Sequence, residues 1–141
     1  MPFVHLHNRS QYSILDGAMR PGDIVKRAQE LSMPAVALTD TCNLYGAVEF
    51  YKAAQSKGVH PVFGSELWVW PEGVDAFDDR TPDGGWNLVL LIESEEGYKN
   101  LCALVTRAIF DGMHFRPRID LKQLEQHRKG LIALTGGIHG P

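Results

Sequence analysis

Two histidines and an aspartate stand close together near the start of the chain. His5, His7 and Asp16 lie in the stretch HLHNRSQYSILDG, directly after a short apolar beginning. Imidazole nitrogens and carboxylate oxygens are ligands that suit zinc, manganese or iron. Arg9 interrupts the set with a positive charge and weakens the case for a metal ion. The stretch therefore indicates either a metal centre or histidines with an ordinary structural role.

The elements that must position these residues follow from the hydrophobic pattern. Apolar runs of strand length alternate with segments of helical periodicity, which is typical of βαβ units, so we predict an α/β fold with mainly parallel strands. Loops at the carboxyl ends of parallel strands line active sites in such folds. His5, His7, Asp40 and Thr41 follow the first two predicted strands and are therefore candidate site residues. The predicted strands are residues 3–6, 34–38, 61–69, 88–92 and 131–134.

Two segments between the strands have the period of an amphipathic helix. Gly58 is placed to close a helix that begins near Tyr45, and Asp23 is placed to help begin the first helix. Residues 71–85 contain two prolines, three glycines and four aspartates, and we predict an exposed loop there. The predicted helix faces consist of Ile24, Ala28 and Leu31 in the first segment and of Tyr98, Leu101, Val105 and Ala108 in the later one.

Composition and charge exclude several classes of protein. The chain has 141 residues, of which 44% are hydrophobic and 22% charged, with no apolar run long enough to span a membrane. Its two cysteines, Cys42 and Cys102, do not make a disulfide framework, which suits the reducing cytoplasm. The 14 basic and 17 acidic side chains give a net charge of −3. The basic runs 116–118 and 127–129 are short, so we expect solvated surface there rather than a DNA-binding patch.

Five ordered blocks of sequence cover nearly the whole chain. They resemble the polymerase and histidinol phosphatase (PHP) domain of bacterial DNA polymerase III alpha subunits. The resemblance implies that residues 1–141 form the first half of a distorted (β/α) barrel, and that the rest of the barrel and the polymerase domains lie outside this chain. The blocks are FVHLHNRSQYSILDGA (3–18), PAVALTDTCNLYGAVEFYKAA (34–54), GVHPVFGSELWV (58–69), NLVLLIESEEGYKNLCALV (87–105) and FRPRIDLKQLEQHRKGLIALTGG (115–137).

The same resemblance implies a degenerate metal site. Metal-binding relatives have histidines where this chain has His7 and Arg9, and a further ligand histidine where it has Thr41. Asn87 aligns with another ligand histidine, and Gly137 with a ligand cysteine. By this resemblance, three ligand positions are retained: His7, Asp16 and Glu66. Four are substituted: Arg9, Thr41, Asn87 and Gly137.

Three functions from different classes follow. The first is a PHP domain of a DNA-directed DNA polymerase that has lost its metals and serves as a scaffold, docking the other polymerase domains and a proofreading exonuclease subunit. DNA would then be bound only through the intact subunit. The second is an active metal-dependent phosphoesterase, acting on a DNA 3′ end or on pyrophosphate. The third is a free-standing phosphatase of the histidinol phosphatase type. The polymerase-type blocks and the four substituted ligands favour the first.

Two expectations belong to the first function. We expect no tightly bound metal cluster and no phosphoesterase activity, whereas an active site would use zinc, manganese or magnesium. We also expect Arg9 to replace the missing metal electrostatically, by lying within salt-bridge distance of Asp16 or Glu66. A guanidinium at that position would also repel an incoming divalent cation.

Overall fold

The computed structural model describes residues 3–70, 85–113 and 115–135. Helices and strands alternate along them except at β2 (His60–Trp70) and β3 (Trp86–Ile92), which follow one another, and the chain divides into two compact units, residues 1–65 and 66–141. Both units combine helices with strands, so the predicted α/β fold class is confirmed. The predicted loop 71–85 lies almost wholly outside the described residues, as does Gly137. No helix in the described ranges has the length and apolar character needed to cross a membrane.

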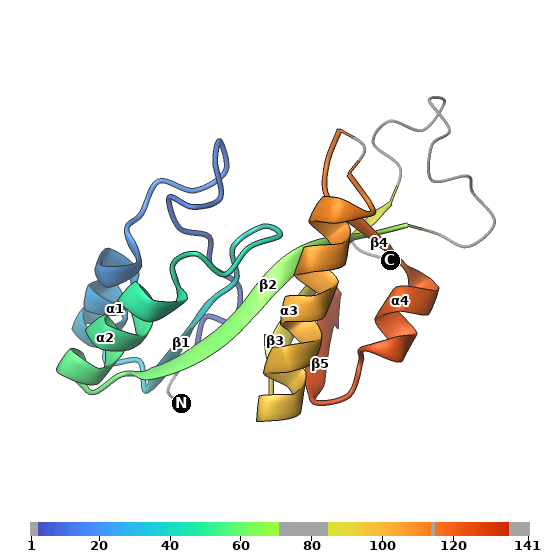
Figure 1. Cartoon of the computed structure of the whole chain (residues 1–141). Coiled ribbons are helices and arrows are strands. Elements are labelled where there is room, and N and C mark those ends of the chain that lie inside the picture. The colour runs from blue at the N-terminus through green and yellow to red at the C-terminus, as the bar shows by residue number, and fades with distance from the viewer. Residues whose placement is uncertain (1–2, 71–84, 114, 136–141) are drawn as a thin grey trace. The chain divides into compact units, whose positions relative to one another are not determined.

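The first unit packs two helices beside a pair of parallel strands. Helix α1 (Pro21–Glu30) packs against α2 (Ala47–Lys57) and contacts β1 (Ala35–Leu38) (Figure 1). Strand β1 pairs in parallel with the beginning of β2 (His60–Trp70), so that Ala35 lies opposite His60 and Leu38 opposite Phe63. The core of this unit consists of Ile24, Val25, Ala28, Val36, Leu38, Phe50, Ala54 and Val59.

The ends of these two helices have local causes. Pro21 occupies the first turn of α1, where its missing N–H is not needed, and Asp23 lies in that turn without capping it through its side chain. Gly58 ends α2 at a φ of +65°, a left-handed conformation that glycine adopts without steric cost, as predicted. The prediction for Leu31 is wrong: it follows the last turn of α1 and is 49% exposed.

The predicted first strand, residues 3–6, is wrong. Only His5 forms a β-bridge, in parallel with Val36. Two backbone bonds join the segment to β1 and the residue after it, from the Ala37 N–H to the His5 carbonyl and from the Thr39 N–H to the Asn8 carbonyl, both at 2.9 Å. Side chains add two more: the Asn8 amide nitrogen donates to the Ala37 carbonyl at 3.0 Å, and the Asn8 backbone N–H donates to the Thr39 hydroxyl at 3.0 Å.

The second unit contains the end of β2, three further strands and two helices. The end of β2 pairs in parallel with β4 (Arg118–Asp120), whereas β3 (Trp86–Ile92) and β5 (Leu131–Thr135) are antiparallel. Helix α3 (Glu95–Phe110) lies beside β3 and β5, and α4 (Leu121–Gln126) leads from β4 to β5 (Figure 1). The antiparallel pair β3–β5 departs from the mainly parallel pattern that the sequence predicted.

The buried face of α3 differs from the predicted one. Leu101 and Ala108 are fully buried, as predicted, but Tyr98 is 52% exposed and Leu104 is buried in addition. The helix begins at Ser94, whose hydroxyl accepts a hydrogen bond from the Gly97 N–H at 3.2 Å. A capping residue therefore fixes where the helix starts. Packing against the strands decides which face of the helix is buried.

Candidate functional site

A buried aspartate holds the loop that carries the first candidate ligands. Asp40, at the end of β1, is 1% exposed and accepts three hydrogen bonds through its carboxylate. The Ser10 N–H donates at 2.6 Å, the Ser10 hydroxyl at 2.7 Å and the Ser13 hydroxyl at 2.6 Å. A buried carboxylate is costly unless donors surround it, so these three bonds account for the burial of Asp40.

The serines extend this network into the backbone. The Ser10 hydroxyl accepts from the Tyr12 N–H at 3.2 Å, and the Ser13 hydroxyl accepts from the Thr41 N–H at 3.1 Å. Both serines are buried, with exposures of 0% and 3%. Their hydroxyls therefore hold the loop in place.

The types and positions of Asp40 and Asn43, between a strand and a helix, are typical of side chains that bond to nearby backbone in a turn, and the sequence predicts that role for both. Asn43 makes them: its side-chain oxygen accepts from the Tyr45 N–H at 3.2 Å, and its amide nitrogen donates to the Thr41 carbonyl at 3.0 Å. For Asp40 this expectation is wrong, because its carboxylate reaches residues 27 and 30 positions earlier in the chain.

Arg9 lies beside a carboxylate. Its guanidinium is 4.0 Å from the Asp16 carboxylate, with side-chain exposures of 29% for Arg9 and 56% for Asp16. The predicted salt-bridge distance to Asp16 is therefore confirmed. Because both groups are in contact with water, the pair is a weak one, of the kind that contributes about 0–1 kcal/mol to stability.

His7 is oriented by its neighbour Thr39. The Nδ1 atom of His7 lies 3.1 Å from the Thr39 hydroxyl oxygen, which donates its own proton to the Asn8 carbonyl at 3.1 Å. A hydrogen bond that orients the imidazole ring in this way is typical of metal-binding histidines.

Two further aligned positions, Glu66 and Asn87, are buried, and Thr41 is half-buried. Glu66 in β2 is 2% exposed, so it is not the solvent-facing strand residue that a glutamate usually is. Thr41 Oγ1 in the first unit and Asn87 Oδ1 in the second are buried oxygens with no hydrogen-bond partner among the described residues. A buried oxygen without a hydrogen-bond partner indicates a side chain that does not suit its surroundings. This agrees with the implied replacement of histidine by Thr41 and Asn87.

The donors that a metal cluster needs are not gathered. Within the parts of the chain that the structure describes, no group of three or more His, Cys, Asp or Glu side chains could hold a metal ion. The side chains present there do not fit a multinuclear centre. His5 is exposed and pairs its ring edge-to-face with Phe3, at 4.7 Å between the centroids.

Sequence reasoning missed a pair of arginine–tryptophan stacks in the second unit. The guanidinium of Arg116 lies 4.5 Å from the ring centroid of Trp68, and that of Arg118 lies 4.1 Å from the ring centroid of Trp70. Arg118 is 6% exposed, which corrects the expectation of a solvated basic run at 116–118. Its burial lowers the pKa of Arg118 from the usual value, because the charged form loses solvation. The sequence signal for these stacks was the matching spacing of two residues between the tryptophans on β2 and between the arginines before and on β4.

Comparison with known proteins places the chain in a family. The family model of the PHP domain matches residues 5–141. The chain belongs to the PHP domain family. This confirms the resemblance seen in the sequence, since the match extends over nearly all of the chain.

The curated relatives of this PHP domain are DNA polymerase III alpha subunits. That of Chlamydia trachomatis is 44% identical over 141 residues, covering 99% of this chain and 11% of the relative. That of Thermus aquaticus is 44% identical over 140 residues, covering 96% of this chain and 12% of the relative. That of Deinococcus radiodurans is 42% identical over 142 residues, covering 95% of this chain and 11% of the relative. The chain therefore spans only about one-ninth of the length of these relatives.

Two solved structures share the fold. An amidohydrolase from Chromobacterium violaceum, with bound sulfate and no metal, superposes with a TM-score of 0.56 at 26% identity, covering 74% of this chain and 32% of that one. A protein of Bifidobacterium adolescentis, assigned by name to the metal-dependent phosphoesterases, has a TM-score of 0.55 at 19% identity and the same coverage. The second likeness bears on the fold alone.

Proposed function

We propose that this PHP domain is part of a DNA polymerase III alpha subunit, and that the longer protein is a DNA-directed DNA polymerase of the cytoplasm. The observation that carries the proposal is the identity of 38–44% to alpha subunits along almost the whole chain. A free-standing phosphatase would have no reason to keep polymerase-type sequence such as EEGYKNL and PRIDLKQLEQH, which forms the capped start of α3 and the β4–α4 segment.

Within that polymerase, the domain acts as a scaffold and docking surface rather than as a second catalytic centre. Arg9 beside Asp16 supports this role, because a guanidinium supplies the positive charge that a carboxylate would otherwise take from a metal ion. The partners are the remaining domains of the subunit and a proofreading exonuclease subunit.

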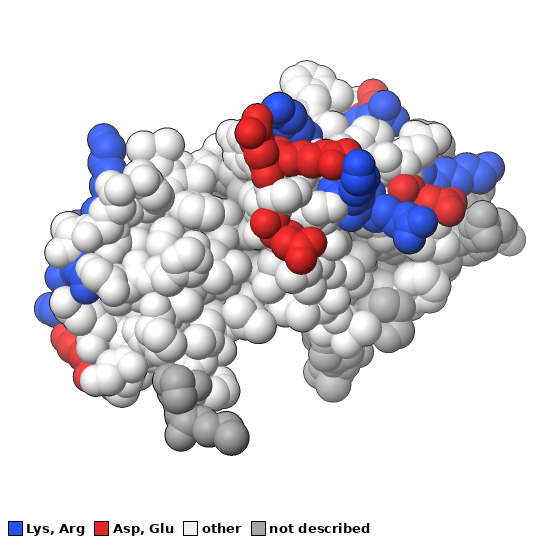
Figure 2. Space-filling model, turned by 90° about the horizontal axis from the view of Figure 1, so that it is seen from below, with Lys and Arg blue, Asp and Glu red and all other residues white. Residues whose placement is uncertain are grey.

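DNA is held by other parts of the subunit. The chain carries a net charge of −3, and Figure 2 shows Lys and Arg side chains interleaved with Asp and Glu on the face in view. Phosphate binding draws on clustered cations that release counterions, which mixed charges do not provide. This supports a role in assembly for the domain and a role in DNA binding for the rest of the protein.

The test is metal analysis of the intact domain together with a phosphodiester hydrolysis assay. We expect no zinc, manganese or magnesium to remain in stoichiometric amount after dialysis, and no turnover. The double variant Arg9→His, Thr41→His restores imidazoles at two aligned positions and removes a cation, so it should bind manganese or zinc more tightly than the parent domain does.

A matched control keeps the loop but removes the retained imidazole. His7→Ala in the double variant should lower the restored metal affinity. The proposal of a metal-free domain fails if the unaltered protein keeps zinc or manganese through dialysis and hydrolyses the substrate in a reaction that His7→Ala abolishes. That result would favour the active phosphoesterase.

A further inference from the structure

Two neighbouring apolar side chains in the first unit project into water. Ile14 is 82% exposed and Leu15 is 99% exposed, at the end of the loop that Asp40 holds. Single exposed leucines are common on protein surfaces, but Leu15 also has a φ of +75°. A residue with a Cβ atom rarely adopts this left-handed conformation, because the Cβ atom crowds the backbone. We call Ile14 and Leu15 the apolar tip.

Hydrogen bonds hold the loop on both sides of the apolar tip. The Ser13 hydroxyl donates to the carboxylate of buried Asp40 at 2.6 Å. The Asp16 N–H donates back to the Ser13 carbonyl at 3.0 Å, and the Gln11 N–H donates to the Met19 carbonyl at 2.8 Å, which closes the base of the loop. A loop that is ordered before binding loses less entropy when it binds, so the tip is a preformed projection.

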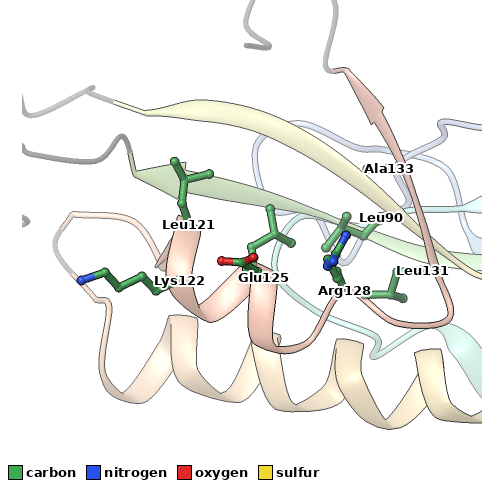
Figure 3. Close-up of a pocket in the computed structure, with 8 residues that line it drawn as sticks. Leu90, Leu121, Lys122, Glu125, Arg128, Leu131 and Ala133 are labelled. Carbon is green, nitrogen blue, oxygen red and sulfur yellow. The ribbon is translucent and has the colours of Figure 1, made fainter.

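A groove in the second unit has the matching apolar character. It has a volume of about 480 Å³ and lies between α4 and the strands β3 and β5 (Figure 3). A volume of this size admits a drug-sized molecule, and therefore two aliphatic side chains. The apolar side chains that line the groove are Leu121 and Leu124 of α4, Leu90 of β3, and Leu131 and Ala133 of β5.

The charged groups beside the tip and beside the groove are complementary. Asp16 directly follows the tip and is 56% exposed, and the Arg9 guanidinium lies 4.0 Å from its carboxylate. At the groove, Glu125 and Arg128 follow one another along α4 and the turn after it (Figure 3), and Lys122 adds a second cation. A tip seated in the groove can bring Asp16 to Arg128 and Arg9 to Glu125, so that opposite charges meet. Because one chain carries both surfaces, a second copy of the chain is the partner that they fit.

We propose that copies of this chain associate head to tail, with the apolar tip of one copy seated in the groove of the next. The tip and the groove are different surfaces, so the contact is heterologous, and the end copies still present one tip and one groove. Assemblies therefore grow with protein concentration and do not stop at a symmetric dimer. Two aliphatic side chains and two ion pairs make a small contact, so the association is weak and reversible.

The test is sedimentation velocity of the 141-residue chain over a range of concentrations. We expect the mean sedimentation coefficient to rise with concentration, and Leu15→Asn to weaken the association by about tenfold or more, because an apolar side chain is lost from the contact. Asparagine adopts the left-handed conformation more readily than leucine, so the loop keeps its shape. Leu31→Asn, at another exposed leucine of the same unit, is the matched control and should leave association unchanged.

A mixture of two variants distinguishes a head-to-tail contact from a symmetric one. Leu15→Asn removes the tip, and Ala133→Glu places a carboxylate in the groove, where it repels Asp16 of the incoming copy. Each variant alone should stay monomeric, whereas the mixture should form a one-to-one complex, because one variant keeps the groove and the other keeps the tip. If Ala133→Glu lowers the melting temperature, Arg128→Glu, at an exposed position of the groove, takes its place.

Each outcome decides the proposal. A chain that stays monomeric up to its highest soluble concentration overturns it, and so does an association that Leu15→Asn leaves intact. Variants that fail to combine in the mixture also overturn it, since other surfaces then make the contact. The longer protein of the proposed function should associate in the same way and lose association with the same substitutions. Association of the 141-residue chain alone would mean that another part of the polypeptide fills the groove, and would reject the second copy as its occupant.

Discussion

At the scale of single residues, Asp40 has the largest predicted effect. We expect Asp40→Asn to lower the free energy of unfolding by about 1–3 kcal/mol, because the amide offers one acceptor oxygen and turns an N–H toward a serine donor. Urea unfolding measures this. Asp111→Asn, at the exposed end of α3, is the matched control and should change stability by less than about 0.5 kcal/mol. Equal effects of the two substitutions would contradict the role of Asp40.

Arg9 should have a smaller effect that depends on salt. We expect Arg9→Ala to lower the free energy of unfolding by up to about 1 kcal/mol at low ionic strength, and by less in high salt, since the Asp16 pair is solvent-exposed. A double-mutant cycle with Asp16→Asn measures the coupling. Arg27→Ala, which removes an exposed pair with Glu30 at 3.0 Å, provides the comparison. No coupling at low salt would mean that Arg9 does not replace a metal charge.

Residue-scale contacts were the least predictable from sequence. The hydrogen-bond partners of Asp40 lie 27 to 30 positions away in the chain, and no local sequence pattern predicts them. The ligand positions His7, Asp16 and Glu66 came from the resemblance, and the burial of Glu66 agrees with it. Their joint role as a site stays a prediction.

At the scale of elements, the turn before β5 depends on two glycines. A Cβ atom at Gly97 would overlap the carbonyl oxygen of Gly130, so the start of α3 lies directly on this turn. We expect Gly97→Ala to lower the free energy of unfolding by about 1–3 kcal/mol, measured by urea unfolding. Gly22→Ala, in the first turn of α1 with nothing within 4 Å of the added Cβ, should leave stability unchanged or raise it by up to about 1 kcal/mol. A stable Gly97→Ala variant would show that the helix can move away from the turn.

Elements with strong local signals were predictable, and short ones were not. The end of α2 follows from Gly58, and β1, β2, β3 and β5 follow from apolar runs. Strand β4 has only three residues and contains an arginine, so no periodicity marks it. Its pairing with β2 depends on a tertiary contact with Trp68 and Trp70, which a local pattern cannot reveal.

At the scale of the whole molecule, the family could be predicted from the sequence more firmly than the activity. Five blocks in order identify the PHP domain, and the family match over residues 5–141 agrees. The chain spans about one-ninth of the length of the alpha subunits that it resembles, so polymerase activity stays a proposal for this protein.

The network around Asp40 has a consequence for how such a domain changes over evolutionary time. The loop from Ser10 to Ser13 is held by a carboxylate and hydroxyls rather than by a metal ion. Its shape is therefore independent of the side chains at Arg9 and Thr41, and histidine at either position would leave these hydrogen bonds in place. If the proposed loss of metal took place, it was a nearly neutral step for the fold, and the step back toward a metal enzyme is a short one.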